Sequence, residues 1–155
     1  MNFDEFKKEL TKYPPGKILF VGLGNEIRGD DCAGILFLHE LEKQSEFSKS
    51  KFLNAGTNPE NYLFRLSDKE VDMIIFIDAV QIESSIGEIF WIDSKNISDF
   101  SMSTHTYSIK MIETWLKTLR PIDIKYLGIS AASFDCSKPV TEKVLNGIKY
   151  FFNRQ

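Results

Sequence analysis

Two acidic residues and one histidine of this sequence stand where an α/β protein could hold a metal ion. Asp31 comes shortly after the first apolar run, Asp78 directly follows a longer one, and His105 precedes a segment with helical periodicity. Two carboxylates and an imidazole suit a divalent transition metal, and zinc and nickel both accept nitrogen and oxygen ligands. The set contains too much nitrogen for calcium, which prefers oxygen ligands throughout.

Each of these residues also has a purely structural interpretation. An aspartate at a helix start often caps the helix, which would explain Asp31. Asp78 could accept hydrogen bonds from loop amides, and His105 could be a hydrogen-bonding residue at a helix start. His39, the other histidine, lies among apolar residues in a helical pattern, so packing or exposure explains it better than metal binding. The case for a site therefore depends on the joint placement of the first three.

Alternating strand and helix patterns would bring these three residues to one edge of a sheet. Such alternation indicates a three-layer α/β/α sandwich with a mostly parallel, five-stranded sheet and one antiparallel strand. Ligands bind such sheets beyond the carboxyl ends of the strands. Short apolar runs predict the strands, which are expected at 18–21, 51–53, 71–77, 88–92 and 124–129.

The connections between these elements give further expectations. Only a short segment separates 71–77 from 88–92, too short for a crossover between parallel neighbours, so an antiparallel hairpin is predicted. Asp78 is expected to terminate the first of these strands. Helices are expected over 2–12, around 35–41, from Asn58-Pro59-Glu60, around 109–116 and from Ser137-Lys138-Pro139.

The composition excludes several classes of protein. A chain of 155 residues fits one domain, expected over 1–155 with an N-terminal helical extension over 1–16. Lys and Arg number 19 against 22 Asp and Glu, a net charge of −3, and no basic cluster indicates nucleic-acid binding. The N-terminus lacks the apolar region of a signal peptide, and no apolar run approaches the roughly 18 residues of a membrane span. Cys32 and Cys136 lack metal-site spacing, so reduced thiols in a cytoplasmic protein are expected.

The loop that follows the first strand does not fit a nucleotide site. It begins Gly22-Leu23-Gly24, but Ile27 stands where a dinucleotide fingerprint has its third glycine. Asp30 and Asp31 would repel a phosphate at the helix start. The loop therefore suits a cation or a polar peptide group. The chain also lacks the G-x-S-x-G motif of serine hydrolases, and neither cysteine lies in a nucleophile motif; Cys32 is expected to have a packing role.

A set of short motifs follows in order along nearly the whole chain from about residue 17. They are Gly22-Leu23-Gly24-Asn25, Gly29-Asp30-Asp31 with Gly34, Gly56-Thr57 with Pro59-Glu60-Asn61, Ile75-Phe76-Ile77-Asp78-Ala79, Gly87-Glu88-Ile89, Ser103-Thr104-His105, Leu127-Gly128-Ile129 and Pro139-Val140-Thr141. This ordered set resembles the [NiFe]-hydrogenase maturation endopeptidases. The Gly-Glu-Ile and Thr-His elements look most similar to the branch that serves hydrogenase-3-type enzymes.

The resemblance implies a specific activity and a specific set of site residues. These enzymes have a phosphorylase/hydrolase-like α/β sandwich and cleave a C-terminal extension from the hydrogenase large subunit after nickel insertion. Their metal-contacting residues map onto Asp31, Asp78 and His105, which would recognise nickel carried by the precursor; no permanent cofactor is expected. Asp31 or Asp78 is a candidate general base, and both carboxylate-driven and metal-assisted hydrolysis remain open.

Two departures from the family pattern keep a second interpretation open. Cys32-Ala33 stands where the family commonly has a glycine after the paired acids, and Asn54 replaces an aspartate. If that glycine supplied a positive φ, the loop geometry here would differ. The alternative is a non-cleaving paralogue that binds the precursor as a nickel checkpoint. A third interpretation, an unrelated hydrolase or nucleotide-binding domain, is disfavoured by the missing motifs.

Overall fold

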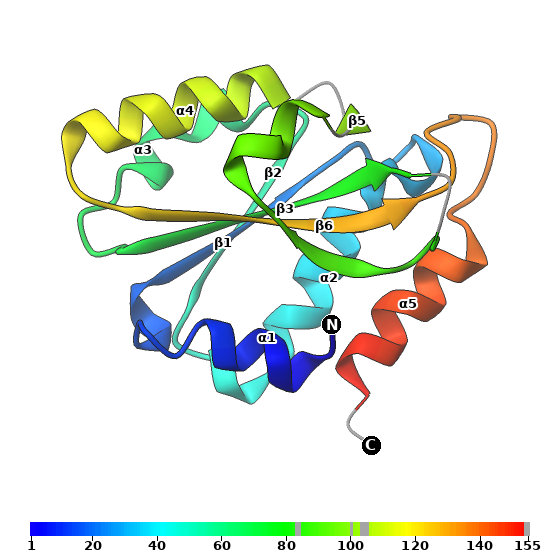
Figure 1. The fold of residues 1–155 in the computed structure, drawn as a ribbon, viewed down its shortest axis with the longest axis horizontal. Coiled ribbons are helices and arrows are strands. Elements are labelled where there is room, and N and C mark those ends of the chain that lie inside the picture. The colour runs from blue at the N-terminus through cyan, green and yellow to red at the C-terminus, as the bar shows by residue number, and fades with distance from the viewer. Residues whose placement is uncertain (83–84, 100, 103–105, 154–155) are drawn as a thin grey trace.

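The computed structural model describes residues 1–82, 85–99, 101–102 and 106–153 of the chain. A mixed β-sheet crosses the middle of the molecule, and helices cover both of its faces (Figure 1). The α/β sandwich with a mostly parallel sheet, predicted from the alternating patterns, is confirmed. None of the helices in the described part of the chain has the length and hydropathy that a membrane crossing requires.

Strands and helices alternate along most of the chain. The strands are β1 (Ile18–Leu23), β2 (Lys51–Gly56), β3 (Met73–Gln81), β4 (Ile89–Ile92), β5 (Ser101–Met102) and β6 (Asp123–Ala131). The α-helices are α1 (Phe3–Glu9), α2 (Ala33–Glu42), α3 (Leu63–Leu66), α4 (Thr106–Leu119) and α5 (Glu142–Phe152). Short 3-10 helices are η1 (Pro15–Lys17), η2 (Gly29–Cys32), η3 (Ser45–Phe47), η4 (Pro59–Tyr62) and η5 (Ser94–Asp99).

The main strands lie in the order β2-β1-β3-β6-β4. β1 pairs in parallel with β2 and β3, β3 pairs in parallel with β6, and β4 runs antiparallel to β6. The two-residue strand β5 pairs antiparallel with the carboxyl end of β3, where Val80 lies opposite Met102. The five-stranded mixed sheet is as expected, and β5 is an addition that no sequence pattern indicated.

The predicted hairpin between 71–77 and 88–92 is wrong, although the second strand is antiparallel as expected. β4 pairs with β6, with Trp91 opposite Leu127, and β6 separates it from β3. A short connection excludes a parallel neighbour but does not require that the two strands be neighbours. β3 is buried through Val80 and needs buried strands on both sides. β4 is half-buried at its two middle residues and therefore suits the edge of the sheet.

β3 also extends further than predicted, because Asp78 does not end the strand. An acidic residue after an apolar run resembles a strand end. Here Ala79 and Val80 beyond it are buried, and pairing with β6 continues as far as Gln81. Asp78 therefore lies within the strand, close to its carboxyl end.

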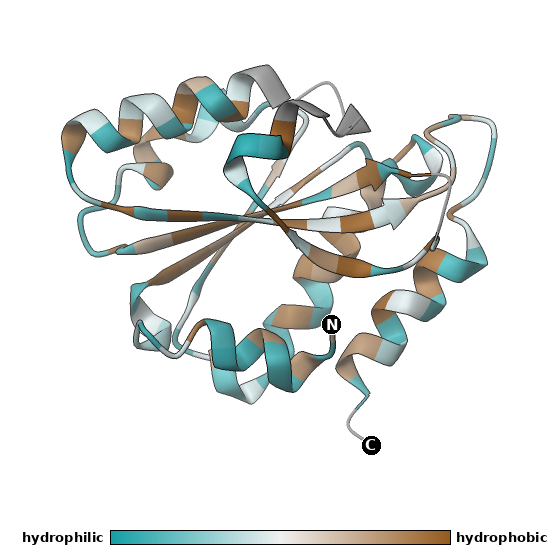
Figure 2. Cartoon of the chain, in the orientation of Figure 1, coloured by the Kyte–Doolittle hydropathy of each residue, from teal (hydrophilic) through white to brown (hydrophobic). Residues whose placement is uncertain are grey.

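Alternate residues of the central strands point into two hydrophobic cores, one on each face of the sheet. Ile18 and Phe20 belong to the core that α1, α2 and α5 cover. Leu19 and Val21 belong to the core that α3 and α4 cover. Figure 2 shows β1 and β3 as largely hydrophobic segments between helices of mixed character. Because both faces are covered, these strands have continuous apolar sequences, which made them recognisable.

The N-terminal segment contributes directly to the first of these cores. Asn2 and Glu5 form a reciprocal capping box that starts α1. Phe6 is fully buried and stacks on Trp91 of β4, with ring centroids 5.4 Å apart. Phe3 meets Phe151 of α5 edge to face, at 6.0 Å. The helix α1 thus packs against both the sheet and the last helix.

The segment after α1 is tied to the start of β6 by a polar contact. The Tyr13 hydroxyl donates to Oδ2 of Asp123 at 2.6 Å, and Lys12 Nζ lies 2.9 Å from the same atom. The Tyr13 hydrogen bond, followed by that of Lys12, holds the pKa of the Asp123 carboxyl below its ordinary value of 3.8. Ionised Asp123 therefore stabilises the position of this segment.

We expect Tyr13→Phe to lower the free energy of unfolding by about 1 kcal/mol at neutral pH. This is the contribution of a hydrogen bond to a charged group, reduced because the pair is partly exposed to solvent. Because folding lowers the pKa of Asp123, its stabilising effect is present above pH 3.8 and is lost as the pH falls through the lowered pKa. The difference from wild type should shrink in acid. Urea denaturation at neutral pH and at a pH below 3.8 measures this difference in unfolding free energy, and exposed Tyr150→Phe is the control. An equal difference at the two pH values would contradict the role of ionised Asp123.

Candidate active site

The sheet has a topological switch point between β1 and β3. After β1 the chain returns through α2 on one face to reach β2, and after β2 it crosses to β3 through α3 on the other face. The strand order therefore reverses direction at β1, and in open α/β sheets ligands bind beyond the carboxyl ends of the strands at such a switch point. Asp31 follows β1 and Asp78 belongs to β3, and these are the two strands that meet at this switch point.

Asp78 is fully buried at the position where β3 extends beyond the end of its pairing with β1. The last registered pair between β1 and β3 is Gly22 with Ile77, and Asp78 then pairs only with Gly128 of β6. Its Oδ1 accepts a hydrogen bond from the Ala79 amide at 2.8 Å. Strand alternation places its side chain on the same face as the residues packed under α4.

Asp31 is also fully buried, in the 3-10 turn η2 that leads into α2. Nη1 of Arg28 lies 3.6 Å from its Oδ2 and supplies a positive charge. The main chain of this turn packs tightly on Gly24, which has a φ of +135°. A Cβ on Gly24 would lie 1.9 Å from the carbonyl oxygen of Asp31, so only glycine fits there. Asp31 is therefore held directly against the end of β1.

A second glycine brings the start of α2 onto the sheet. A Cβ on Gly34 would lie 2.3 Å from the carbonyl oxygen of Ile77 and 2.5 Å from that of Leu23. The first turn of α2 thus rests on the ends of both β3 and β1. Gly34 touches the residue directly before Asp78, and Asp31 precedes Gly34 by one helical turn. The two predicted carboxylates are brought to the same edge of the sheet.

Asp30 fastens this loop to the segment between β6 and α5, which lies beside η2 in Figure 1. Its carboxylate is fully buried and accepts four hydrogen bonds. Thr141 donates through its amide at 2.6 Å and its hydroxyl at 2.7 Å, and the amides of Ala132 and Ser133 donate at 2.9 and 3.3 Å. The Asp30 amide in turn donates to the Ser133 carbonyl at 3.0 Å.

These bonds correct one predicted boundary. The last helix was expected from Ser137-Lys138-Pro139, but α5 begins at Glu142, with Thr141 as its extended N-cap residue. Because Thr141 turns both its amide and its hydroxyl towards Asp30, the chain stays extended until that contact is made. A proline after polar residues resembles a helix start, and only the distant Asp30 explains why the helix starts later.

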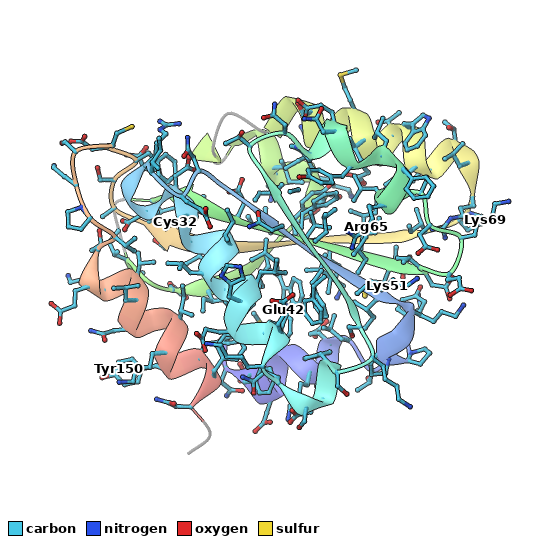
Figure 3. All side chains as sticks on the ribbon, turned by 180° about the vertical axis from the view of Figure 1, so that it is seen from behind. Cys32, Glu42, Lys51, Arg65, Lys69 and Tyr150 are labelled. Carbon is cyan, nitrogen blue, oxygen red and sulfur yellow. The ribbon has the colours of Figure 1, made fainter. Side chains whose placement is uncertain are left out.

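The two departures from the family pattern both lie in ordinary local geometry. Cys32 has a φ of −82°, a conformation open to any residue, so the loop requires no glycine there. Its thiol donates to the Gly29 carbonyl at 3.3 Å, and burial raises the pKa of the thiol, consistent with the expected packing role. Asn54 is exposed, and its side-chain oxygen accepts from the Gly56 amide at 3.1 Å. Figure 3 shows Cys32 beside the start of α2.

His105, the third predicted residue, lies outside the described residues. The nearest described neighbours are Met102, whose backbone pairs with Val80 two residues beyond Asp78, and Thr106, where α4 begins. Within the described ranges, which exclude 103–105, no group of three or more His, Cys, Asp and Glu side chains could hold a metal ion. The structure therefore describes the positions of Asp31 and Asp78 at one edge of the sheet, and the three-residue site stays a prediction.

Four other polar residues were either considered and set aside from the sequence or noticed only in the structure. His39 is exposed on α2, in agreement with the interpretation that it is no ligand, and Cys136 is exposed in the loop before α5. Asp30, which fastens the loop of Asp31, and Arg28, which lies beside Asp31, were not among the predicted residues. The pair of adjacent acids was the available signal for Asp30, and the three-residue spacing from Asp31 was the signal for Arg28.

Comparison with known proteins gives a consistent result. A family model described as hydrogenase maturation protease matches residues 35–153, a range that begins after Asp31 and contains Asp78 and His105. A putative hydrogenase maturation protease of Methanocaldococcus jannaschii is 33% identical over 141 residues, covering 86% of this chain and 83% of the relative. A second from the same organism is 29% identical over 139 residues, covering 84% and 88%.

The fold comparison agrees with these sequence matches. The crystal structure of a [NiFe] hydrogenase maturation protease, HycI, from Thermococcus kodakarensis superposes with a TM-score of 0.73. It is 25% identical in sequence, and the match covers 86% of each chain.

Proposed function

Because this chain belongs to the hydrogenase maturation protease family, we propose that it is the endopeptidase that removes the C-terminal extension of a nickel-loaded [NiFe]-hydrogenase large-subunit precursor. The observation that carries the proposal beyond family membership is a pair of fully buried carboxylates, Asp31 and Asp78, at the switch point of the sheet. Burying a carboxylate is costly unless a cation or hydrogen-bond donors compensate it. Such a pair is well suited to receive a divalent metal.

In this proposal Asp31, Asp78 and His105 recognise the nickel ion that the precursor brings. Carboxylate and imidazole ligands both suit nickel. Asp78 lies on the α4 face of the sheet, and His105 directly precedes α4 in the sequence, which supports grouping the two. Nickel is part of the substrate here, so its presence reports that the precursor is ready for cleavage.

The nickel contact makes cleavage conditional. A precursor without nickel offers these side chains nothing to coordinate, so it gains none of the differential affinity that selects the loaded form. Hydrolysis of the peptide bond then needs an activated water, and a carboxylate of the same pair is the general base. The proposal places the protein with its precursor in the cytoplasm and requires neither nucleic acid nor membrane as a partner.

The test compares nickel-loaded with nickel-free precursor. Purified protein is incubated with each form, and the mass of the large subunit is followed by gel mobility and mass spectrometry. We expect shortening of the loaded form alone. Equal cleavage of both forms would refute recognition through nickel. Stable binding of the loaded form without shortening would refute the peptidase and favour the checkpoint alternative.

A further inference from the structure

The carboxylate of Asp31 already has a cation beside it. Arg28 Nη1 lies 3.6 Å from Asp31 Oδ2, with the aspartate side chain 1% exposed and the arginine side chain 34% exposed. A buried carboxylate keeps its charge more readily when a positive group compensates it. Arg28 therefore already supplies part of the positive charge that a metal ion bound to Asp31 would supply.

We propose that Arg28 is a resident counter-cation that competes with free metal ions for Asp31, and so reserves the site for nickel delivered by a docked precursor. This inference rests on the proposed function, because it takes Asp31 to be a nickel-recognising group. It assigns to Arg28 the role of a specificity-determining residue.

The geometry of Arg28 suits a cation that is displaced during recognition. Its distance to the carboxylate oxygen exceeds the roughly 2.7–2.9 Å of a tight charge-assisted hydrogen bond. Its main chain is fixed, since its amide donates to the Asn25 carbonyl at 3.1 Å and its carbonyl accepts from the Asp31 amide at 3.0 Å. The partly exposed side chain can therefore turn into solvent while the loop that holds Asp31 keeps its shape.

The competition favours delivered nickel over free nickel. A charge of opposite sign within a few ångströms changes the proton affinity of an aspartate by about one to three powers of ten, and it acts against any other cation in the same way. A free metal ion has to overcome that opposition alone. Nickel in a docked precursor arrives with protein contacts that raise its effective concentration at the site. Arg28 thus lowers affinity for both forms but prevents retention only of the free ion.

The test measures binding of the bare metal ion to the whole protein. Isothermal titration with NiCl2 compares wild type with Arg28→Met, which removes the charge and keeps most of the bulk, and with Arg28→Lys, which keeps the charge. We expect Arg28→Met to bind Ni²⁺ at least about tenfold more tightly than wild type, and Arg28→Lys to stay close to wild type. Adding Asp31→Asn to Arg28→Met should abolish the gain.

The outcomes separate this inference from the proposed function. Wild-type cleavage of loaded precursor tests the function, whereas the Ni²⁺ affinities test Arg28. Unchanged affinity in Arg28→Met, no measurable binding by either protein, or an equal gain in Arg28→Lys would each overturn the role of Arg28. Arg28→Gln repeats the measurement if the methionine variant fails to fold, as judged by circular dichroism. A gain that persists with Asp31→Asn would also overturn it.

Discussion

Asp78→Asn should abolish shortening of the nickel-loaded precursor while leaving the protein folded. The asparagine side-chain oxygen can still accept the Ala79 amide, which is the hydrogen bond that Oδ1 makes at 2.8 Å, so β3 keeps its local structure. The change removes the negative charge that would hold nickel or accept a proton from water. We expect the cleavage rate to fall about a thousandfold or more, the scale on which a general acid–base group acts. Gel mobility of the large subunit measures the rate.

Two variants serve as controls for this experiment. Asp72→Asn makes the same chemical change at the other end of β3, because Asp72 directly precedes Met73, the first residue of the strand. This variant should cleave the precursor as the wild type does. His39→Ala removes the exposed histidine of α2 and is the counterpart of His105→Ala, which should lose activity. Wild-type cleavage by Asp78→Asn, with circular dichroism showing a folded protein, would remove Asp78 from the site. The same result for Asp31→Asn as well would end the proposal.

Asp30→Asn should destabilise the protein more than any conservative change at the surface. The fully buried carboxylate accepts from three amides and one hydroxyl, and an asparagine would turn its NH2 group towards these donors. Hydrogen bonds to charged groups contribute about 1.5–3 kcal/mol each, and a stranded donor adds its own cost, so a loss of about 3 kcal/mol is expected. A melting temperature lower by about 6–12 °C should follow, measured by differential scanning calorimetry.

A matched control lies in the same loop. Asp135 accepts from the amide and hydroxyl of Ser137, yet it is exposed, so water can replace either bond. Asp135→Asn should melt close to wild type. If Asp30→Asn also has a melting temperature close to that of the wild type, the four hydrogen bonds of Asp30 are not what holds the loop before α5 to η2. Thr141→Val, which removes only the hydroxyl bond, should fall between the two.

The sequence predicted the central strands, and the common sheet edge of Asp31 and Asp78, for a simple physical reason. β1 and β3 are buried on both faces, so their sequences are continuous apolar runs that glycine and aspartate interrupt. Parallel strands then place Asp31 and Asp78 at a common edge without knowledge of any contact. Local pattern was sufficient wherever burial alone determined the structure.

The errors in strand pairing and in the start of α5 came from interactions between residues far apart in the chain. The pairing of β4 with β6 depends on a strand that follows it, and no periodicity within 88–92 encodes that neighbour. The late start of α5 depends on Asp30, more than a hundred residues earlier, and the two-residue β5 is too short for any pattern. Arg28 is a different case, because its partner Asp31 is only three residues away, and the sequence spacing does not show that Asp31 is buried.

The position of β6 links the candidate site to translation. β6 lies between β3 and β4 in the sheet, although it is synthesised after both (Figure 1). Until it emerges from the ribosome, one edge of β3 lacks its parallel partner, and open strand edges invite aggregation and degradation. Asp78, which lies opposite Gly128, cannot be fully enclosed before then. A nascent or prematurely terminated chain therefore lacks the enclosed candidate site that the complete sheet provides.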